Sequence, residues 1–149
     1  MRETVVLFGN FAVEHPLLDQ AARQFGWSLM VAKSVGRLRD LGSKRNVVAV
    51  LCDLSALASP WNEALQAVRS AVPKALPIVC QRFSDTDVWP ELAEAGAFHS
   101  ISLPLNPCEV RQSLGFVWAA RHARRPVEPV PSVYTLERGL TALSESLAI

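Results

Sequence analysis

The 149-residue sequence has no closely spaced CxxC pair of cysteines, no long apolar run and no large excess of positive or negative charge. Its three cysteines, Cys52, Cys80 and Cys108, lie far apart and are odd in number, which argues against a disulfide framework or a zinc site. A reducing, cytoplasmic compartment suits this composition. No apolar run approaches the roughly 18 residues of a membrane span, and the first run is too short for a signal peptide. We therefore expect a soluble protein that is not inserted in a membrane.

The charge balance and the missing motifs narrow the functional classes. Fifteen Lys and Arg residues against 14 Asp and Glu give a net charge of +1, so nucleic acid is not an expected partner. The glycine motifs GxGxxG and GxxxxGK[ST] of nucleotide-binding enzymes are absent. His99 has no second histidine or acid at metal-ligand spacing, and thiols within apolar strands are poor nucleophiles. We expect no catalytic residue, no metal site and no enzymatic activity.

Five short apolar runs alternate with amphipathic stretches along the chain. The runs cover residues 4–8, 27–32, 47–52, 77–81 and 100–103. This alternation predicts a parallel sheet with helices on both faces. The third run is continuously apolar, as expected for a central strand that is hidden on both faces. The length of the chain is sufficient for one such domain with a full core.

The stretches between these runs carry helix signals. Pro16 and Pro107 open two helical patterns, and Ser34 is suited to cap a third. Gly26 and Gly42 follow helical patterns and predict their ends. The last helix carries four apolar residues that we expect to face the core: Val110, Leu114, Val117 and Trp118.

The composition changes after residue 122. Three prolines within residues 123–131 predict an extended linker. In residues 132–149, apolar side chains recur every three or four residues, which predicts a short amphipathic helix. About two heptads are too few for a stable isolated helix. The segment therefore either docks on its own domain or a second chain, or it remains a frayed tail.

The residues at the carboxyl ends of the predicted strands are the ones to examine for function, because ligands of open parallel sheets bind there. The first strand is followed by Gly9 and Asn10, and the third by Asp53. The fourth ends in Gln81-Arg82 and the fifth in Leu103-Pro104. An ionised carboxylate at the end of a buried strand is costly unless it is paired, so Asp53 requires an explanation.

This order of residues resembles the receiver domain of two-component response regulators. The matches are Asp53 closing the third strand, the proline-led fourth strand at residues 77–82, Ala95-Gly96-Ala97 before the fifth strand, and Leu103-Pro104 where the family has Lys-Pro. The resemblance covers about residues 4–122. It implies a flavodoxin-like (CheY-like), doubly wound, five-stranded parallel sheet with helices on both faces, followed by the linker and the C-terminal helix. It also implies a cis bond before Pro104.

The resemblance further implies a role for Asp53. In the family this aspartate accepts a phosphoryl group from a histidine kinase, with Mg²⁺ held by two acids after the first strand. At the other positions of that machinery the sequence departs from the family: Gly9 and Asn10 replace the acids, Leu103 the lysine, Arg82 the reporting hydroxyl, and Ser100 the switch aromatic. We therefore predict a degenerate receiver, or pseudo-receiver, that requires no cofactor and acts in phosphorelay signalling by protein–protein interaction.

The residues leave three interpretations of Asp53 open. It can form an ion pair with Arg82, which would hold the site in one state. It can be a hydrated aspartate that caps the following loop. It can also be a working phosphoacceptor with atypical Mg²⁺ ligands, which is the alternative function. A weaker possibility is a small enzyme or ligand-binding protein with an anion pocket over Asn10, Asp53 and Arg82.

The partners expected from the resemblance are proteins. They are a histidine kinase or a regulatory protein, a second copy of this chain, or both. Family members commonly pair through the fourth helix, fifth strand and fifth helix. We expect a homodimer either on that face or through the apolar seam of residues 132–149.

Overall fold

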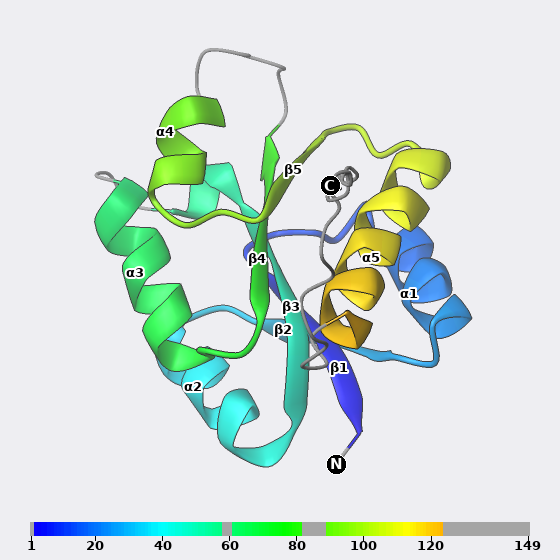
Figure 1. Cartoon of the computed structure of the whole chain (residues 1–149), viewed down its shortest axis with the longest axis horizontal. Helices are drawn as coiled ribbons and strands as arrows, with labels where there is room; N and C mark the ends of the chain where they lie inside the picture. Colours follow the sequence, from blue (N-terminus) through cyan, green and yellow to red (C-terminus); the bar gives the residue numbers. More distant parts are fainter. Residues whose placement is uncertain (1, 58–60, 82–88, 124–149) are drawn as a thin grey trace, which may run out of the picture. The chain divides into compact units, whose positions relative to one another are not determined.

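The five apolar runs form one parallel sheet in the order β2-β1-β3-β4-β5 (Figure 1). The computed structural model describes residues 2–57, 61–81 and 89–123. The strands are β1 (Glu3–Phe8), β2 (Ser28–Ala32), β3 (Asn46–Asp53), β4 (Leu76–Gln81) and β5 (His99–Ser102). The predicted fold class, a CheY-like doubly wound sheet, is confirmed. Each boundary lies within one residue of the run that predicted it.

Helices cover both faces of this sheet. They are α1 (His15–Gln24), α2 (Val35–Lys44), α3 (Trp61–Ala71), α4 (Trp89–Glu94) and α5 (Pro107–His122), with one short 3₁₀ turn, η1 (Leu54–Ala56). Two hydrophobic clusters result, one between the sheet and α1 and α5, the other between the sheet and α2, α3 and α4 (Figure 1). Asn106 begins α5, since its Oδ1 accepts hydrogen bonds from the backbone N–H groups of Cys108 and Glu109.

The central strand β3 contributes to both clusters, which explains its continuous apolar sequence. Leu51 packs toward α1 and α5, whereas Val50 and Cys52 pack toward α2, α3 and α4. All three side chains are fully buried. A strand that is hidden on both faces has no solvent side, so no polar residue interrupts it until Asp53.

Two sequence expectations are wrong in detail. Trp118 is 45% exposed, because it follows Val117 by one residue and is therefore rotated about 100° from the buried stripe of α5. Gly42 does not end α2, which continues to Lys44. It lies where α2 passes closest to the end of α3, and an added Cβ atom would be 2.8 Å from Val72 Cγ1. Gly42 is thus a packing residue and not a helix stop.

The chain divides into two units, Met1–Trp118 and Ala119–Ile149. Of the second unit, residues 119–123, the end of α5 and the residue after it, are described. The remainder of the predicted linker at 123–131 and the predicted helix at 132–149 lie outside the described residues. Among the helices that the structure describes, none is both long and apolar enough to cross a bilayer.

Candidate functional site

The parallel register gathers the predicted site residues at the carboxyl edge of the sheet. Asp53 pairs with Cys80 of the neighbouring strand β4, and Gln81 pairs with Ser102 of β5. Phe8, the last residue of β1, pairs with Cys52. The loop that begins at Gly9 therefore leaves the sheet beside Asp53, and Leu103 follows on the far side of β4.

Asp53 is 3% exposed and caps the turn that follows it. Its Oδ1 atom accepts hydrogen bonds from the backbone N–H of Ser55 at 3.1 Å and from the Ser55 hydroxyl at 2.9 Å. These bonds satisfy donors at the start of η1 and compensate part of the cost of burying the carboxylate. This is the arrangement of the capping interpretation. Arg82 lies outside the described residues, so the Asp53–Arg82 pair stays a hypothesis.

The loop after β1 does not present the oxygen donors that Mg²⁺ requires. Gly9 has no side chain and adopts a φ of 119°, a conformation that favours glycine. The Oδ1 atom of exposed Asn10 accepts a hydrogen bond from the backbone N–H of Ala12 at 3.2 Å, so this oxygen stabilises the loop. Mg²⁺ prefers a near-octahedral set of oxygens, several of them anionic. The residues at these positions do not fit that ion.

The position of the family's lysine is filled by an apolar side chain. Leu103 is 3% exposed and packs in the cluster covered by α1 and α5. Its backbone N–H donates to the carbonyl oxygen of Gln81 at 2.7 Å, and the Leu103–Pro104 peptide bond is cis. Ser100, at the position of the switch aromatic, pairs with Val79 on the inner side of β5. Neither residue supplies a cation or an aromatic ring.

The structure adds a buried acid that the sequence analysis missed. Glu14 is 7% exposed and stands at the N-cap of α1, without a side-chain cap bond. Burial raises the pKa of the Cys80 thiol well above its ordinary value, and nearby charges raise it further, those of Cys52, Asp53, Glu14 and Glu109. The three carboxylates among these charges belong to β3, to the N-cap of α1 and to α5. Within the described parts of the chain, no three His, Cys, Asp or Glu residues form a group that could hold a metal ion.

The signal for Glu14 in the sequence was weak. The residue precedes His15-Pro16, where a helix starts, and glutamate is not among the favoured capping residues. An unusual acid at a helix start is a reason to ask what surrounds it. Its burial depends on α1 folding back on the sheet, which spacing along the chain does not reveal.

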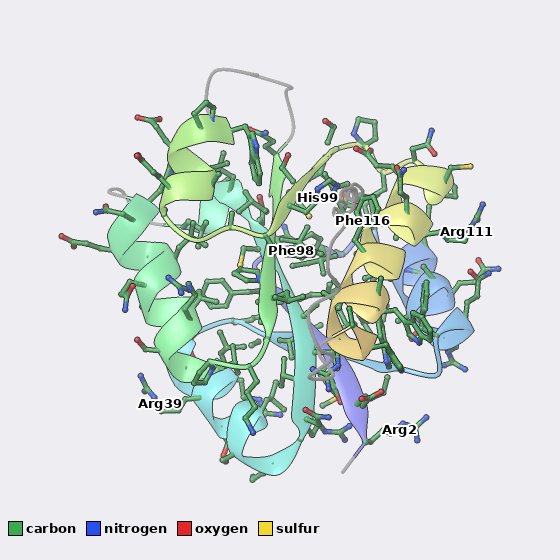
Figure 2. The ribbon with its side chains drawn as sticks, in the orientation of Figure 1. Arg2, Arg39, Phe98, His99, Arg111 and Phe116 are labelled. Atoms are coloured by element: carbon green, nitrogen blue, oxygen red, sulfur yellow. The ribbon has the colours of Figure 1, made fainter. Side chains whose placement is uncertain are left out.

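A second feature of interest lies on the edge strand β5 and on α5. The rings of His99 and Phe116 meet edge to face, with centroids 5.5 Å apart and planes at 87°. Figure 2 shows His99 of β5 beside Phe116 of α5, while Arg111 projects from α5 away from them. Phe116 is 44% exposed. We call His99 and Phe116 the β5–α5 aromatic face.

Comparison with solved structures identifies the fold. A response regulator from Thermotoga maritima matches with a TM-score of 0.68 at 15% identity, over 78% of this chain and 98% of that protein. A CheY-like receiver domain protein from Methanospirillum hungatei matches with a TM-score of 0.67 at 14% identity, over 84% and 100%. A CheY-like protein (tadZ) from Pseudomonas aeruginosa matches with a TM-score of 0.64 at 18% identity, over 78% and 99%. This chain has the fold of the CheY-like response regulator receiver domain. Neither a family model nor a curated protein matches the sequence.

Proposed function

We propose that this chain is a degenerate receiver domain of the cytoplasm. It acts in phosphorelay signal transduction through protein–protein contact and does not depend on Mg²⁺ or on phosphotransfer. The observation that carries this proposal is the state of the carboxyl edge. Asp53 is present, but its Oδ1 atom caps the next turn, and Asn10 and Leu103 stand where acids and a cation would be needed.

The physical requirement behind this argument is neutralisation of charge. A carboxylate that attacks a phosphoryl group approaches a second anion, and the transition state needs cations or preorganised donors around its oxygens. The apolar side chain of Leu103 offers neither a positive charge nor a hydrogen-bond donor. After β1, a glycine and one neutral amide occupy the two positions from which the resemblance expects acids for a divalent cation.

The first prediction concerns phosphorylation. Incubation of the purified chain with acetyl phosphate and Mg²⁺ is expected to leave its mass unchanged, because Asp53 lacks an activating cation site. Intact-mass spectrometry over a wide Mg²⁺ range is the measurement, and Asp53→Asn is the matched control. A receiver domain known to accept phosphate serves as the positive control. A Mg²⁺-dependent phosphoryl adduct on the wild type that Asp53→Asn lacks would establish the alternative, a phosphoacceptor switch with atypical ligands.

The β5–α5 aromatic face is the contact surface that we assign to this function. Because β5 is the last strand of the sheet, one of its edges has no neighbouring strand within the described residues. Aromatic side chains that are half exposed are favoured anchors of protein interfaces. Phe116 fits this role, since it is 44% exposed and contacts the ring of His99 edge to face. We propose that a second copy of the chain, or a regulatory protein, packs on this face.

A pair of α5 variants tests this surface. Phe116→Ala is expected to raise the dimer dissociation constant by about tenfold or more, since central aromatic anchors contribute most of the energy of an interface. Arg111→Ala, on the other side of the same helix, is expected to leave it unchanged (Figure 2). Analytical ultracentrifugation gives both constants. A wild-type chain that stays monomeric, or an equal response of the two variants, would contradict homodimerisation through this face.

A further inference from the structure

A pocket of about 600 Å³ opens at the carboxyl edge, between the loop after β1 and the end of β2. It lies on the β2 side of β1, whereas Asp53 lies on the β3 side. We propose that this pocket binds a small organic carboxylate with a compact apolar body. The receiver chemistry discussed above does not use this site.

The walls of the pocket are suited to an apolar group. Phe11, which is 4% exposed, and the methyl group of Ala12 come from the loop after β1. Val31, which is 37% exposed, comes from the edge strand β2. Gly9 adds no side chain at the wall nearest the sheet. The volume is within the range of about 300–1,000 Å³ that is typical of small-molecule sites, whose linings are mainly apolar.

The polar groups of the pocket point to an anion. Its lining includes the side chains of Lys33 and His15 and no acid. Neither of these two side chains forms a hydrogen bond or an ion pair within the residues that the structure describes. The Oδ1 atom of Asn10 is engaged with Ala12, which leaves the amide N–H groups of Asn10 as further donors at the rim.

The balance of charge and apolar surface selects the ligand class. One ammonium group, one imidazole and one amide can donate to the two oxygens of a carboxylate. A phosphate dianion would need more donors than this lining provides, and a neutral molecule would forgo the charge-assisted hydrogen bond that Lys33 can donate. The apolar wall then accommodates the rest of the molecule, so an aromatic or short branched monocarboxylate fits both features.

Benzoate is the probe that tests this proposal. Titration of the ¹⁵N-labelled full chain is expected to shift the backbone amides of residues 9–15 and 31–33, with a dissociation constant on the order of 1 mM or lower. Benzamide, which keeps the ring and lacks the charge, and inorganic phosphate, which lacks the apolar body, are expected to bind at least about tenfold more weakly. Equal binding of either compound would overturn the proposal, as would the absence of shifts with benzoate.

Two lysine variants locate the site. Lys33→Gln is expected to weaken benzoate binding by about tenfold, because it removes a charge-assisted hydrogen bond. Lys74→Gln changes another exposed lysine, which precedes β4 at the amino-terminal edge of the sheet, and is expected to leave the affinity unchanged. Unchanged affinity in Lys33→Gln, or a loss in Lys74→Gln, would assign the binding elsewhere and overturn the proposal. Both lysines are exposed, so neither variant compromises the fold.

Discussion

Gly42→Ala is expected to lower the free energy of unfolding by about 1–3 kcal/mol relative to Gly36→Ala, although both glycines belong to α2. Alanine improves helix propensity at either position by up to about 1 kcal/mol. At Gly42, however, the new Cβ atom would lie 2.8 Å from Val72 Cγ1 and 3.1 Å from the carbonyl oxygen of Ala71. Val72 is β-branched and buried, and Ala71 presents backbone, so neither neighbour can move at low cost.

Gly36 is the matched control because a Cβ atom there meets only the Ser34 hydroxyl, at 3.9 Å. Urea unfolding of the wild type and the two variants, followed by circular dichroism, gives the difference directly. Gly36→Ala is expected to be as stable as the wild type or more so. Equal stability of the two variants would show that α2 does not approach the end of α3 as closely as described.

The two buried thiols are expected to make the protein lose stability steeply in alkaline solution. Burial raises the pKa of Cys52 from 9.0 to about 12, and burial together with the nearby charges raises the pKa of Cys80 well above 9.0. A thiol whose pKa is raised on folding stabilises the folded state fully below its unfolded pKa. As the pH rises beyond about 9, the unfolded chain releases the proton while the folded chain keeps it, so the free energy of unfolding falls.

The magnitude of this loss is about 1.4 kcal/mol for each pH unit and each thiol, until the pH reaches the folded pKa. Urea unfolding at a series of pH values between about 8 and 11 measures the slope. The double variant Cys52→Ala with Cys80→Ala is expected to show a slope that is shallower by the contribution of both thiols, whatever its stability at neutral pH. Cys108→Ala changes an exposed thiol and is expected to keep the wild-type slope. Parallel slopes for all three proteins would contradict the burial of these thiols.

The fold could be predicted from the sequence because its signals are local and repeated. Each apolar run became a strand, and the continuous run at residues 47–52 became the central one. A residue such as Gly42 was misread for the opposite reason. Its role depends on α3, about 30 residues further along the chain, and a glycine that admits a neighbouring helix looks the same in sequence as one that ends its own. Trp118 was wrongly predicted to face the core. It lies one residue beyond buried Val117, and a shift of one residue along a helix is enough to turn a side chain toward solvent.

In the candidate site, too, some features could be predicted from the sequence and others could not. The choice of Asp53, Asn10 and Leu103 as site residues, and the proposal that they form a degenerate receiver site, follow from their types and their places after predicted strands. Which atoms they contact does not follow. The hydrogen bonds of Asp53 Oδ1 to Ser55, the burial of Glu14 and the meeting of His99 with Phe116 each require strands and helices to be placed against one another.

The residue types and their spacing predict the architecture and the edge of the sheet that carries the candidate site, and they motivate the proposal that this edge does not hold magnesium. These properties depend on residue type and on the spacing of apolar residues in strands and helices, both of which can be read directly from the sequence. Three relations come from the packing of the elements: the capping bonds of Asp53, the contact between His99 and Phe116, and the presence of Lys33 and His15 in one pocket. Such relations join residues that are distant in sequence, and the packing of helices on the sheet brings them together.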